Sequence, residues 1–188
     1  MTINVVTFWC EVIKSMLDLA HKYEDEIRVK MFDTWYDTKY KFYHSSVYHD
    51  IYSLDGNNGD WDSRQFVSLN SFGNILGLIG YGIDRTTEIA NGFGAINFSD
   101  DKFTFGLDLG KVIDDIFCKF NMRKLEFSVV VGNPIEKSYD KMVVKYGGQV
   151  AGILKAHYKL VDNNYYDEKM YEIFRDDYIA VKEKRIKC

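Results

Sequence analysis

The 188-residue sequence predicts an α+β fold: a mixed, mostly antiparallel central sheet with one parallel pair of strands and flanking helices. Three observations lead to this prediction. Segments with a strand-like period alternate with segments with a helix-like period. A strand–helix–strand unit in the middle of the chain requires a right-handed crossover, and therefore a parallel pair. A long hairpin follows it. No repeat or linker interrupts the chain, so we expect a single domain over 1–188.

The first 60 residues are expected to be mainly helical. Apolar residues recur at three- and four-residue steps from Val5 to Ala20, which predicts an amphipathic helix ending near the acidic cluster 24–26. The aromatic-rich segment from Phe32 to Tyr48 is also interpreted as helix, with rings that pack against a sheet. Residues 54–62, LDGNNGDWD, predict a loop, because Gly, Asn and Asp favour turns.

Three strands are expected next. Residues 64–72 and 74–84 predict an antiparallel hairpin joined by Gly73, and residues 89–99 predict a third strand. The period then changes to that of a helix over 100–121.

The helix expected within 100–121 has its apolar residues on one side. Asp108 is assigned as its N-cap, and Cys118 is expected to lie in the core.

The second half of the chain continues with a strand, a helix and a hairpin. LEFSVVV, residues 125–131, predicts a buried strand. Residues 135–146 predict a helix that Gly147-Gly148 ends, and Pro134 suits a first turn. VAGILKAHYKLV and YYDEKMYEIF, separated by DNN, predict the long hairpin.

Composition excludes several classes of function. The net charge is 24 − 28 = −4, so a nucleic-acid partner is not expected. No apolar run reaches the roughly 18 residues of a membrane span, and no signal peptide is recognisable. The three cysteines form neither a disulfide framework nor a metal motif. We therefore expect a cytoplasmic protein with no membrane partner and no metal site.

None of the common catalytic motifs occurs, including G-x-S-x-G, H-E-x-x-H and the nucleotide-binding glycine motifs. One junction is a candidate site. A strand ends at Asn97-Phe98-Ser99, and a helix is expected to begin near Gly106-Leu107-Asp108. Free N–H groups at a helix start favour anions such as phosphate. The alternative is an ordinary loop between a strand and a helix.

The segment NPIEKSYDKMVVKYGGQVAGILKAHYKLVDNNYYDEKMYEIFRDDY, residues 133–178, resembles the GNAT superfamily of acyl-CoA-dependent N-acetyltransferases. It is similar to the family's "N … Y … K … GG … VG" followed by a hairpin with "Y-x-D … x-Y-x-I-x-R-x-x-Y". The ribosomal-protein N-terminal acetyltransferase branch and phage-type members share this ending. The resemblance covers residues 64–178, the expected cofactor-binding core, and leaves 1–60 as the variable N-terminal region.

The resemblance implies that the co-substrate acetyl-CoA lies in a cleft where strands 89–98 and 125–131 splay apart. The pantetheine arm would add to the first strand near Ala95 and Ile96, and the pyrophosphate would sit at the start of the next helix. The residues that it implies for cofactor binding are Asn97, Phe98, Phe105, Gly106, Leu107, Asp108, Leu109, Asn133 and Tyr139.

The resemblance also implies roles in catalysis. Tyr139 would be the general acid that protonates the departing thiolate, and a carboxylate or water would accept the proton of the amine. Glu88 and Glu126 are the candidate bases, since either could reach a cleft from its strand. The alternatives are that Tyr139 packs at the edge of the core and that each glutamate is a solvated charge at a strand end.

The sequence departs from the family at its phosphate loop. The family's [RQ]-x-x-G-x-[GA] corresponds to residues 103–108, where Phe103 replaces the leading Arg or Gln and Asp108 the last small residue. Two alternatives to an enzyme therefore stay open: a GNAT-fold binding protein without catalysis, and an unrelated α/β protein. The acceptor amine also stays open between a protein N-terminus or lysine, a polyamine and a small metabolite. The family commonly dimerises, so a homodimer is one expected assembly.

Overall fold

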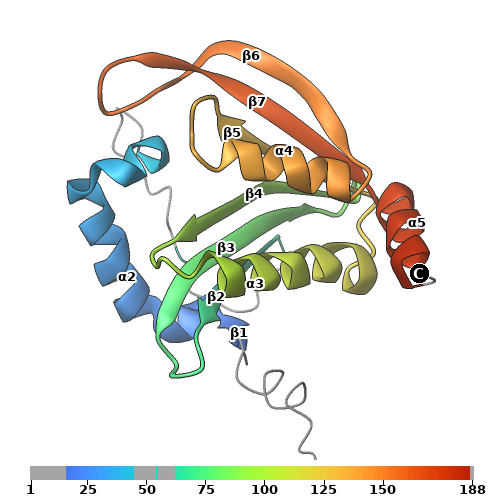
Figure 1. The fold of residues 1–188 in the computed structure, drawn as a ribbon, viewed down its shortest axis with the longest axis horizontal. Coiled ribbons are helices and arrows are strands. Elements are labelled where there is room, and N and C mark those ends of the chain that lie inside the picture. The colour runs from blue at the N-terminus through green and yellow to red at the C-terminus, as the bar shows by residue number, and fades with distance from the viewer. Residues whose placement is uncertain (1–15, 45–53, 55–61, 187–188) are drawn as a thin grey trace, which may run out of the picture.

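A computed structural model describes residues 16–44, 54 and 62–186. In these ranges seven strands form one sheet in the order β1-β2-β3-β4-β5-β7-β6 (Figure 1). Neighbouring strands are antiparallel except β4 and β5, which are parallel. The strands are β1 (Met16–Leu19), β2 (Ser63–Leu69), β3 (Ile75–Asp84), β4 (Ile89–Asn97), β5 (Lys124–Val130), β6 (Gln149–Lys159) and β7 (Tyr165–Phe174). The predicted mixed, mostly antiparallel α+β fold is confirmed.

Helices lie on both faces of the sheet. The α-helices are α2 (Glu24–Asp33), α3 (Lys102–Asp114), α4 (Glu136–Lys145) and α5 (Arg175–Ile186). Short 3-10 helices are η1 (Ala20–Tyr23), η2 (Thr34–Tyr36) and η3 (Thr38–Tyr43), and η4 (Asp115–Lys119) is a π-helical turn that extends α3. Figure 1 shows α3 and α4 in front of the sheet and α5 at one end of it.

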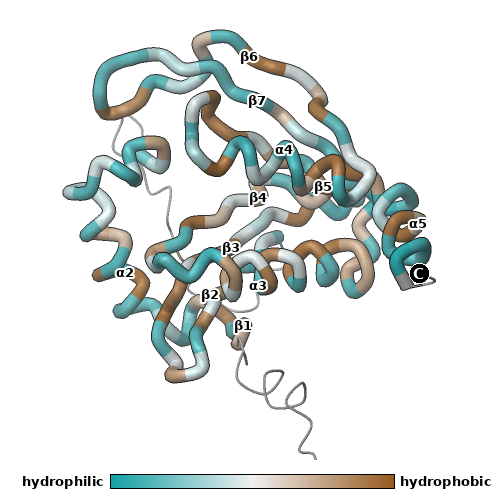
Figure 2. Tube along the Cα trace, viewed as in Figure 1, coloured by the Kyte–Doolittle hydropathy of each residue, from teal (hydrophilic) through white to brown (hydrophobic). Residues whose placement is uncertain are grey.

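Two apolar clusters fill the space on the two faces. The larger one joins α3 and α4 to the sheet, with Val112, Phe117, Phe127 and Tyr171 among its buried members. The smaller one joins η1, α2 and η3 to the other face of β2, β3 and β4. Hydrophobic segments recur along α3 and the strands that it covers (Figure 2). Among the described residues, no helix has the length and apolar character needed to cross a membrane.

The predicted helix from Val5 to Ala20 is wrong where it can be compared. Its first residues lie outside the described ranges, and Met16–Leu19 form strand β1 at the edge of the sheet. Leu17 pairs with Ser68 and Leu19 with Phe66, because the open edge of β2 offers backbone hydrogen-bonding groups that override a short helical pattern. The acidic residues 24–26 form the first turn of α2, where negative charge favours a helix start.

The aromatic segment is helical only in part. α2 ends at Asp33, and η2 and η3 continue to Tyr43; the rest of the segment and nearly all of the predicted loop 54–62 lie outside the described residues. Farther along, the π-helical turn at η4 leaves Cys118 exposed instead of in the core. Apart from the start of α3, the other predicted strands and helices are confirmed within a few residues at their ends.

Candidate active site

Strands β4 and β5 separate soon after they begin. They pair only through Ile89 with Lys124 and Ala90 with Leu125, and beyond these residues no pairing joins them. A cavity of about 480 Å³ lies at the opening. Its walls include Tyr43 from η3, Gly94, Ala95 and Ile96 from β4, Ser128, Val129 and Val130 from β5, Asn133 and Tyr139 from the loop and helix that follow, and Tyr158 from β6.

A bulge bends β4 away from β5. The register with β3 shifts between Gly80 and Gly82, and Gly92 on β4 has a φ of +57°. A bulge adds an unpaired residue and increases the local twist of a strand. The bulge lies just after the last residues that pair with β5, so it helps to open the cleft.

The edge of β4 that faces the opening presents backbone groups. Phe98 donates its N–H to the carbonyl of Leu76 at 2.8 Å. Since the bonding direction alternates along an antiparallel pair, Gly94, Ile96 and Phe98 bond to β3. The peptide groups of Ala95 and Asn97 therefore point to the opposite side, which is the open edge.

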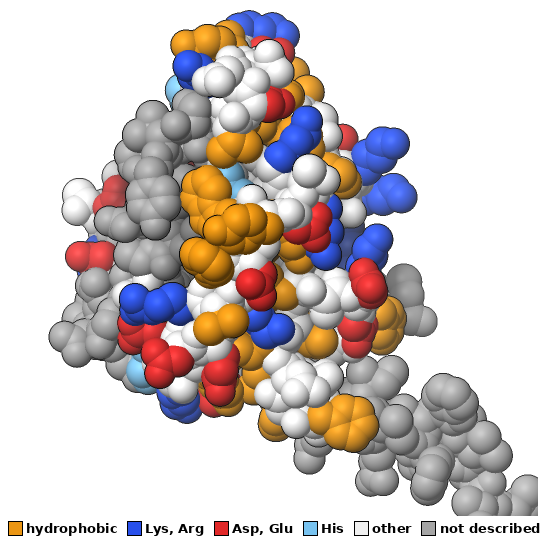
Figure 3. Space-filling view, turned by 90° about the vertical axis from the view of Figure 1, so that its left-hand side faces the viewer, with side chains coloured by type: hydrophobic (Ala, Val, Ile, Leu, Met, Phe, Trp, Pro, Cys, Tyr) orange, Lys and Arg blue, Asp and Glu red, His pale blue; other side chains and the backbone are white. Residues whose placement is uncertain are grey.

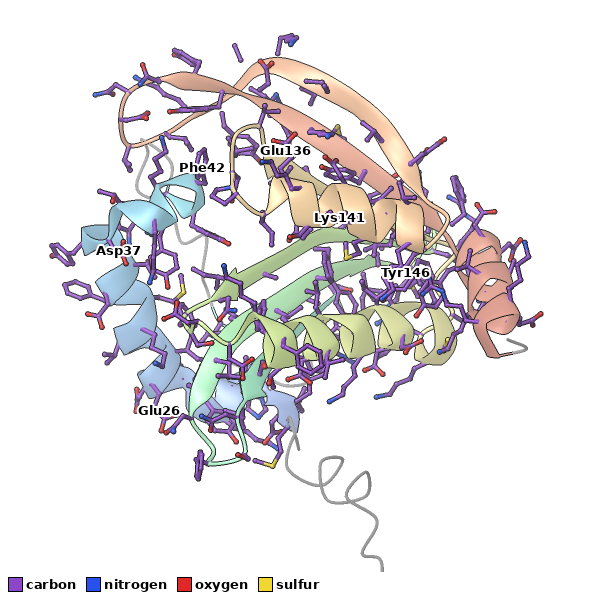
Figure 4. All side chains as sticks on the ribbon, in the orientation of Figure 1. Glu26, Asp37, Phe42, Glu136, Lys141 and Tyr146 are labelled. Carbon is purple, nitrogen blue, oxygen red and sulfur yellow. The ribbon has the colours of Figure 1, made fainter. Side chains whose placement is uncertain are left out.

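Two tyrosines from η3 occupy part of this edge. The Tyr43 hydroxyl donates to the carbonyl of Ala95 and the Tyr40 hydroxyl to the carbonyl of Asn97, each at 3.2 Å. Burial raises the pKa of Tyr43 to about 12, so it remains a donor at neutral pH. Figure 4 labels their neighbour Phe42, whose ring approaches Tyr166 of β7 with 5.9 Å between centroids. The segment thus spans from β4 to the hairpin across the opening.

The start of α3 differs from the prediction. The N-cap is Asp101, whose carboxylate accepts a hydrogen bond from the N–H of Thr104 at 2.9 Å, and this bond lowers the pKa of Asp101. Asp108 lies inside the helix, fully buried, where it accepts from the Ser68 hydroxyl at 2.7 Å and pairs with Lys111 at 2.8 Å. The assignment of Asp108 as the N-cap is therefore wrong.

The loop before α3 bonds to itself. Asn97 Oδ1 accepts from the Ser99 N–H at 2.8 Å, Ser99 Oγ accepts from the Asp101 N–H at 3.2 Å, and the carbonyl of Asp100 accepts from the Lys102 N–H at 2.9 Å. Several of the N–H groups that a phosphate would use at a helix start thus already have partners. The predicted contacts at Phe105, Gly106, Leu107 and Leu109 fall within α3, beyond its first residues.

Tyr139 and Asn133 lie in the cavity wall. Tyr139 is 4% exposed and packs edge-on against Phe127, with 5.2 Å between ring centroids. Burial raises the pKa of Tyr139 far above its ordinary value. Asn133 Oδ1 accepts from the N–H of Ile135 at 3.2 Å, which fixes the turn that leads into α4. Gly147, with a φ of +76°, ends that helix.

Solved structures of acetyltransferases share this fold. A spermidine N-acetyltransferase from Vibrio cholerae in complex with CoA and spermine has a TM-score of 0.68 and 18% identity, over 88% of this chain and 98% of that one. A spermidine/spermine N-acetyltransferase of the same organism with manganese ions gives 0.66 and 19%, over 88% and 95%. The chain has the GNAT fold. No family model matches the sequence, and no curated protein does.

A third structure, of the dodecameric form of the Vibrio cholerae spermidine N-acetyltransferase, has a TM-score of 0.56 and 23% identity, over 64% of this chain and 69% of that one. At these identities the likeness establishes the fold alone. The finer resemblance to the ribosomal-protein and phage-type branches stays a prediction.

Neither candidate base lies in the described wall of the GNAT cleft. Glu88 is exposed and precedes the paired end of β4, where its carbonyl accepts from the Arg123 N–H at 2.8 Å. Glu126 forms an ion pair with Lys124 on β5. Both residues are therefore near the closed end of the cleft, where β4 and β5 pair.

Side chains that the sequence did not single out surround the opening. Ser128 and Tyr158 line the cavity, and Glu168 on β7 is 6% exposed. Alternation along 125–131 does place Ser128 on the face opposite Phe127, which is a usable signal. Nothing comparable marks Glu168, because its burial depends on a bulge in the neighbouring strand.

Gly106 supplies a test of where α3 begins in this GNAT fold. It lies within the helix, and a Cβ placed there would meet nothing within 4 Å. We expect Gly106→Ala to stabilise the protein by about 0.5–1 kcal/mol, because Gly weakens a helix interior, and to leave acetyl-CoA binding unchanged. Chemical denaturation and calorimetry measure the two effects. Weaker acetyl-CoA binding would mean that residue 106 contacts the phosphates after all.

Proposed function

We propose that this protein is an N-acetyltransferase of the GNAT type, which transfers an acetyl group from acetyl-CoA to a primary amine. The observation that carries the proposal is the cavity between the diverging strands β4 and β5, with the buried Tyr139 in its wall. The spermidine N-acetyltransferases of Vibrio cholerae share the fold. A polyamine is therefore one acceptor to test beside other primary amines.

The cleft offers suitable groups for the pantetheine arm. An extended chain can add to a free strand edge through backbone hydrogen bonds. The Ala95 and Asn97 peptide groups face the opening, and the Gly94 backbone beside them carries no side chain that would block an approach. Asn133 and Tyr139 would then lie near the thioester end.

The reaction that this arrangement supports is direct transfer. The neutral amine nitrogen attacks the thioester carbonyl carbon and a C–N bond forms. The nitrogen then releases its surplus proton to solvent, and the C–S bond breaks. The leaving thiolate takes the hydroxyl proton of Tyr139, which is then restored from solvent. Because burial raises the pKa of Tyr139, the hydroxyl stays protonated until it is needed.

The second candidate function is that of a GNAT-fold binding protein without catalysis. Two observations favour it. Tyr40 and Tyr43 already donate to the backbone carbonyls of the β4 edge, and two exposed acidic residues, Asp100 and Asp101, lie at the start of α3, where the pyrophosphate would bind. A carboxylate beside a pyrophosphate opposes binding through like-charge repulsion. If the protein is an enzyme, we therefore expect modest affinity for acetyl-CoA.

Calorimetric titration with acetyl-CoA separates the two candidates. We expect binding at micromolar concentrations, and about five- to tenfold tighter binding for Asp101→Gly, which removes a carboxylate, frees the Thr104 N–H and weakens the helix cap only slightly. Asp101→Asn keeps the cap and isolates the effect of charge. Asp176→Asn, in the exposed first turn of α5, is the matched control.

The outcomes of the titration are distinct. No binding by the wild-type protein at high micromolar acetyl-CoA would reject the enzyme. Binding without release of free thiol in the presence of a panel of amines, including spermidine and butylamine, would favour the binding protein.

A further inference from the structure

A buried acid–base pair lies beside the cavity, on the hairpin of β6 and β7. Glu168 is 6% exposed, and its Oε2 lies 3.2 Å from Nε2 of His157, whose side chain is half exposed. Among the described residues, the only other buried carboxylate is Asp108, which Ser68 and Lys111 hold within α3. Burial of a carboxylate costs free energy unless it is paired, so the position of Glu168 calls for an explanation.

The register places Glu168 on the face of the sheet opposite to Tyr139. Glu168 pairs with Val130, and the neighbouring Ser128 pairs with Met170. Paired residues in antiparallel strands share a face, so Glu168 lies with Ser128 and Val130, both of which line the cavity. Tyr139 packs on Phe127, whose side chain points to the other face. The cavity thus has a phenol on one side and a carboxylate near the other.

Tyr158 connects Glu168 to the cavity. It lines the cavity and pairs with Tyr166, which lies two residues from Glu168 on β7, so its side chain shares a face with Glu168 and Ser128. Burial raises the pKa of Tyr158, and the negative charge of Glu168 raises it further. A hydroxyl that shares a face with a carboxylate and a second hydroxyl is suited to pass on a proton.

A bulge in β6 brings His157 close to Glu168. The register with β7 shifts between Leu154 and Tyr158, and Ala156 has a φ of +48°. Asp167 holds the bulge, because its carboxylate accepts from the Ala156 N–H at 2.9 Å and pairs with Lys155 at 2.7 Å. In a regular strand His157 and Tyr158 would lie on opposite faces. The bulge lets both approach Glu168.

We propose that Tyr158, supported by Glu168 and His157, removes the proton from the acceptor ammonium. The inference rests on the proposed acetyl transfer and adds the missing base. Tyr158 is the catalytic residue that meets the amine, and Glu168 and His157 are positioning residues that act through it. The ammonium proton passes to the Tyr158 oxygen as the Tyr158 proton moves to Glu168. His157 then carries the proton to solvent, and the free amine attacks.

Few charged groups surround this proton relay, which consists of Tyr158, Glu168 and His157. On the hairpin, Lys155 is paired with Asp167, and Asp162 accepts from the Tyr166 hydroxyl at 2.6 Å. From η3, Lys41 approaches Asp162 at 3.8 Å and the Tyr166 hydroxyl at 3.4 Å. These groups are mostly paired with one another, and His157 is the ion-pair partner of the Glu168 carboxylate among the described residues.

Glu168→Gln tests the relay with two kinds of acceptor. Butylamine is protonated at neutral pH and needs the relay, whereas 4-methoxyaniline is already neutral and does not. We expect Glu168→Gln to lower kcat/KM for butylamine about 10²-fold at neutral pH, with recovery as the pH rises, and to change the value for the aniline less than about threefold. Tyr158→Phe should show the same selectivity. Glu172 lies on the same strand and face but is paired with Lys124 and Gln149. Glu172→Gln should therefore leave kcat/KM unchanged for both amines.

The outcomes separate the relay from the proposed function. An equal decrease in kcat/KM for both amines at every pH would show a structural role for Glu168 and overturn the inference. An unchanged kcat/KM for butylamine in Glu168→Gln would also overturn it. A wild-type protein that binds acetyl-CoA but acetylates neither these two amines nor spermidine would reject the transferase itself, and the relay with it. Thermal unfolding of each variant controls for misfolding.

Discussion

Replacing Tyr139 by Phe is expected to lower kcat for acetyl transfer by about 10²-fold and to leave Kd for acetyl-CoA within about twofold. Only the hydroxyl is lost, and the ring keeps its packing on Phe127 and Tyr171. Steady-state kinetics and calorimetry measure the two quantities. An unchanged kcat would remove Tyr139 from the mechanism.

Tyr171→Phe is the matched control for this variant. Tyr171 belongs to the same aromatic cluster, but its hydroxyl donates to Asp140 at 2.8 Å instead of lining the cavity. We expect Tyr171→Phe to lose about 1 kcal/mol of stability with little change in kcat. Equal losses of kcat in both variants would point to a general loss of packing.

The pKa of Tyr139 also predicts a pH dependence of stability. Burial raises the folded-state pKa above the unfolded value near 10, so the folded protein binds this proton more tightly. The corresponding stability is fully present below pH of about 10 and declines as the pH rises toward the folded-state pKa. Tyr139→Phe should therefore show a weaker alkaline loss of stability than the wild-type protein.

Gly77→Ala is expected to produce the largest loss of stability, on the order of 3 kcal/mol. A Cβ at Gly77 would lie 2.3 Å from the carbonyl oxygen of Ile96 and 2.4 Å from the ring of Phe105. The first contact is with backbone, which cannot rotate away. Strands β3 and β4 and the start of α3 would have to separate, so both the free energy of unfolding and binding in the cleft should decrease.

Gly152→Ala is the matched control, because Gly152 is also in a strand but a Cβ there would meet nothing within 4 Å. Chemical denaturation of both variants gives the comparison. Equal stability of Gly77→Ala and Gly152→Ala would show that β3, β4 and α3 are not packed as closely as described.

Most of the fold was predictable because long segments have a clear period. The run 125–131 and the helix between Pro134 and Gly147 each carry several consistent signals. Strand β1 was not predictable, since four residues at a sheet edge depend on a partner that is distant in sequence. The cap of α3 was assigned wrongly because Asp101 and Asp108 both suit an N-cap, and only the structure shows that Asp108 is buried against Ser68.

The site was predictable to a smaller extent. Asn133 and Tyr139 follow from the resemblance in 133–178, and both line the cavity. The contacts of Tyr40 and Tyr43 with β4 join residues more than 50 positions apart, and the sequence carries no sign of them. Glu168 escaped notice because its burial and its contact with His157 depend on the bulge at Ala156.

A crystal structure of the protein with acetyl-CoA shows directly whether the cleft holds the co-substrate. We expect the pantetheine arm between β4 and β5, bonded to the Ala95 and Asn97 peptide groups after Tyr40 and Tyr43 withdraw from them. We expect the thioester sulfur within hydrogen-bond reach of the Tyr139 hydroxyl. Acetyl-CoA bound outside the cleft, or a cleft still filled by the two tyrosines at saturating ligand, would contradict this expectation.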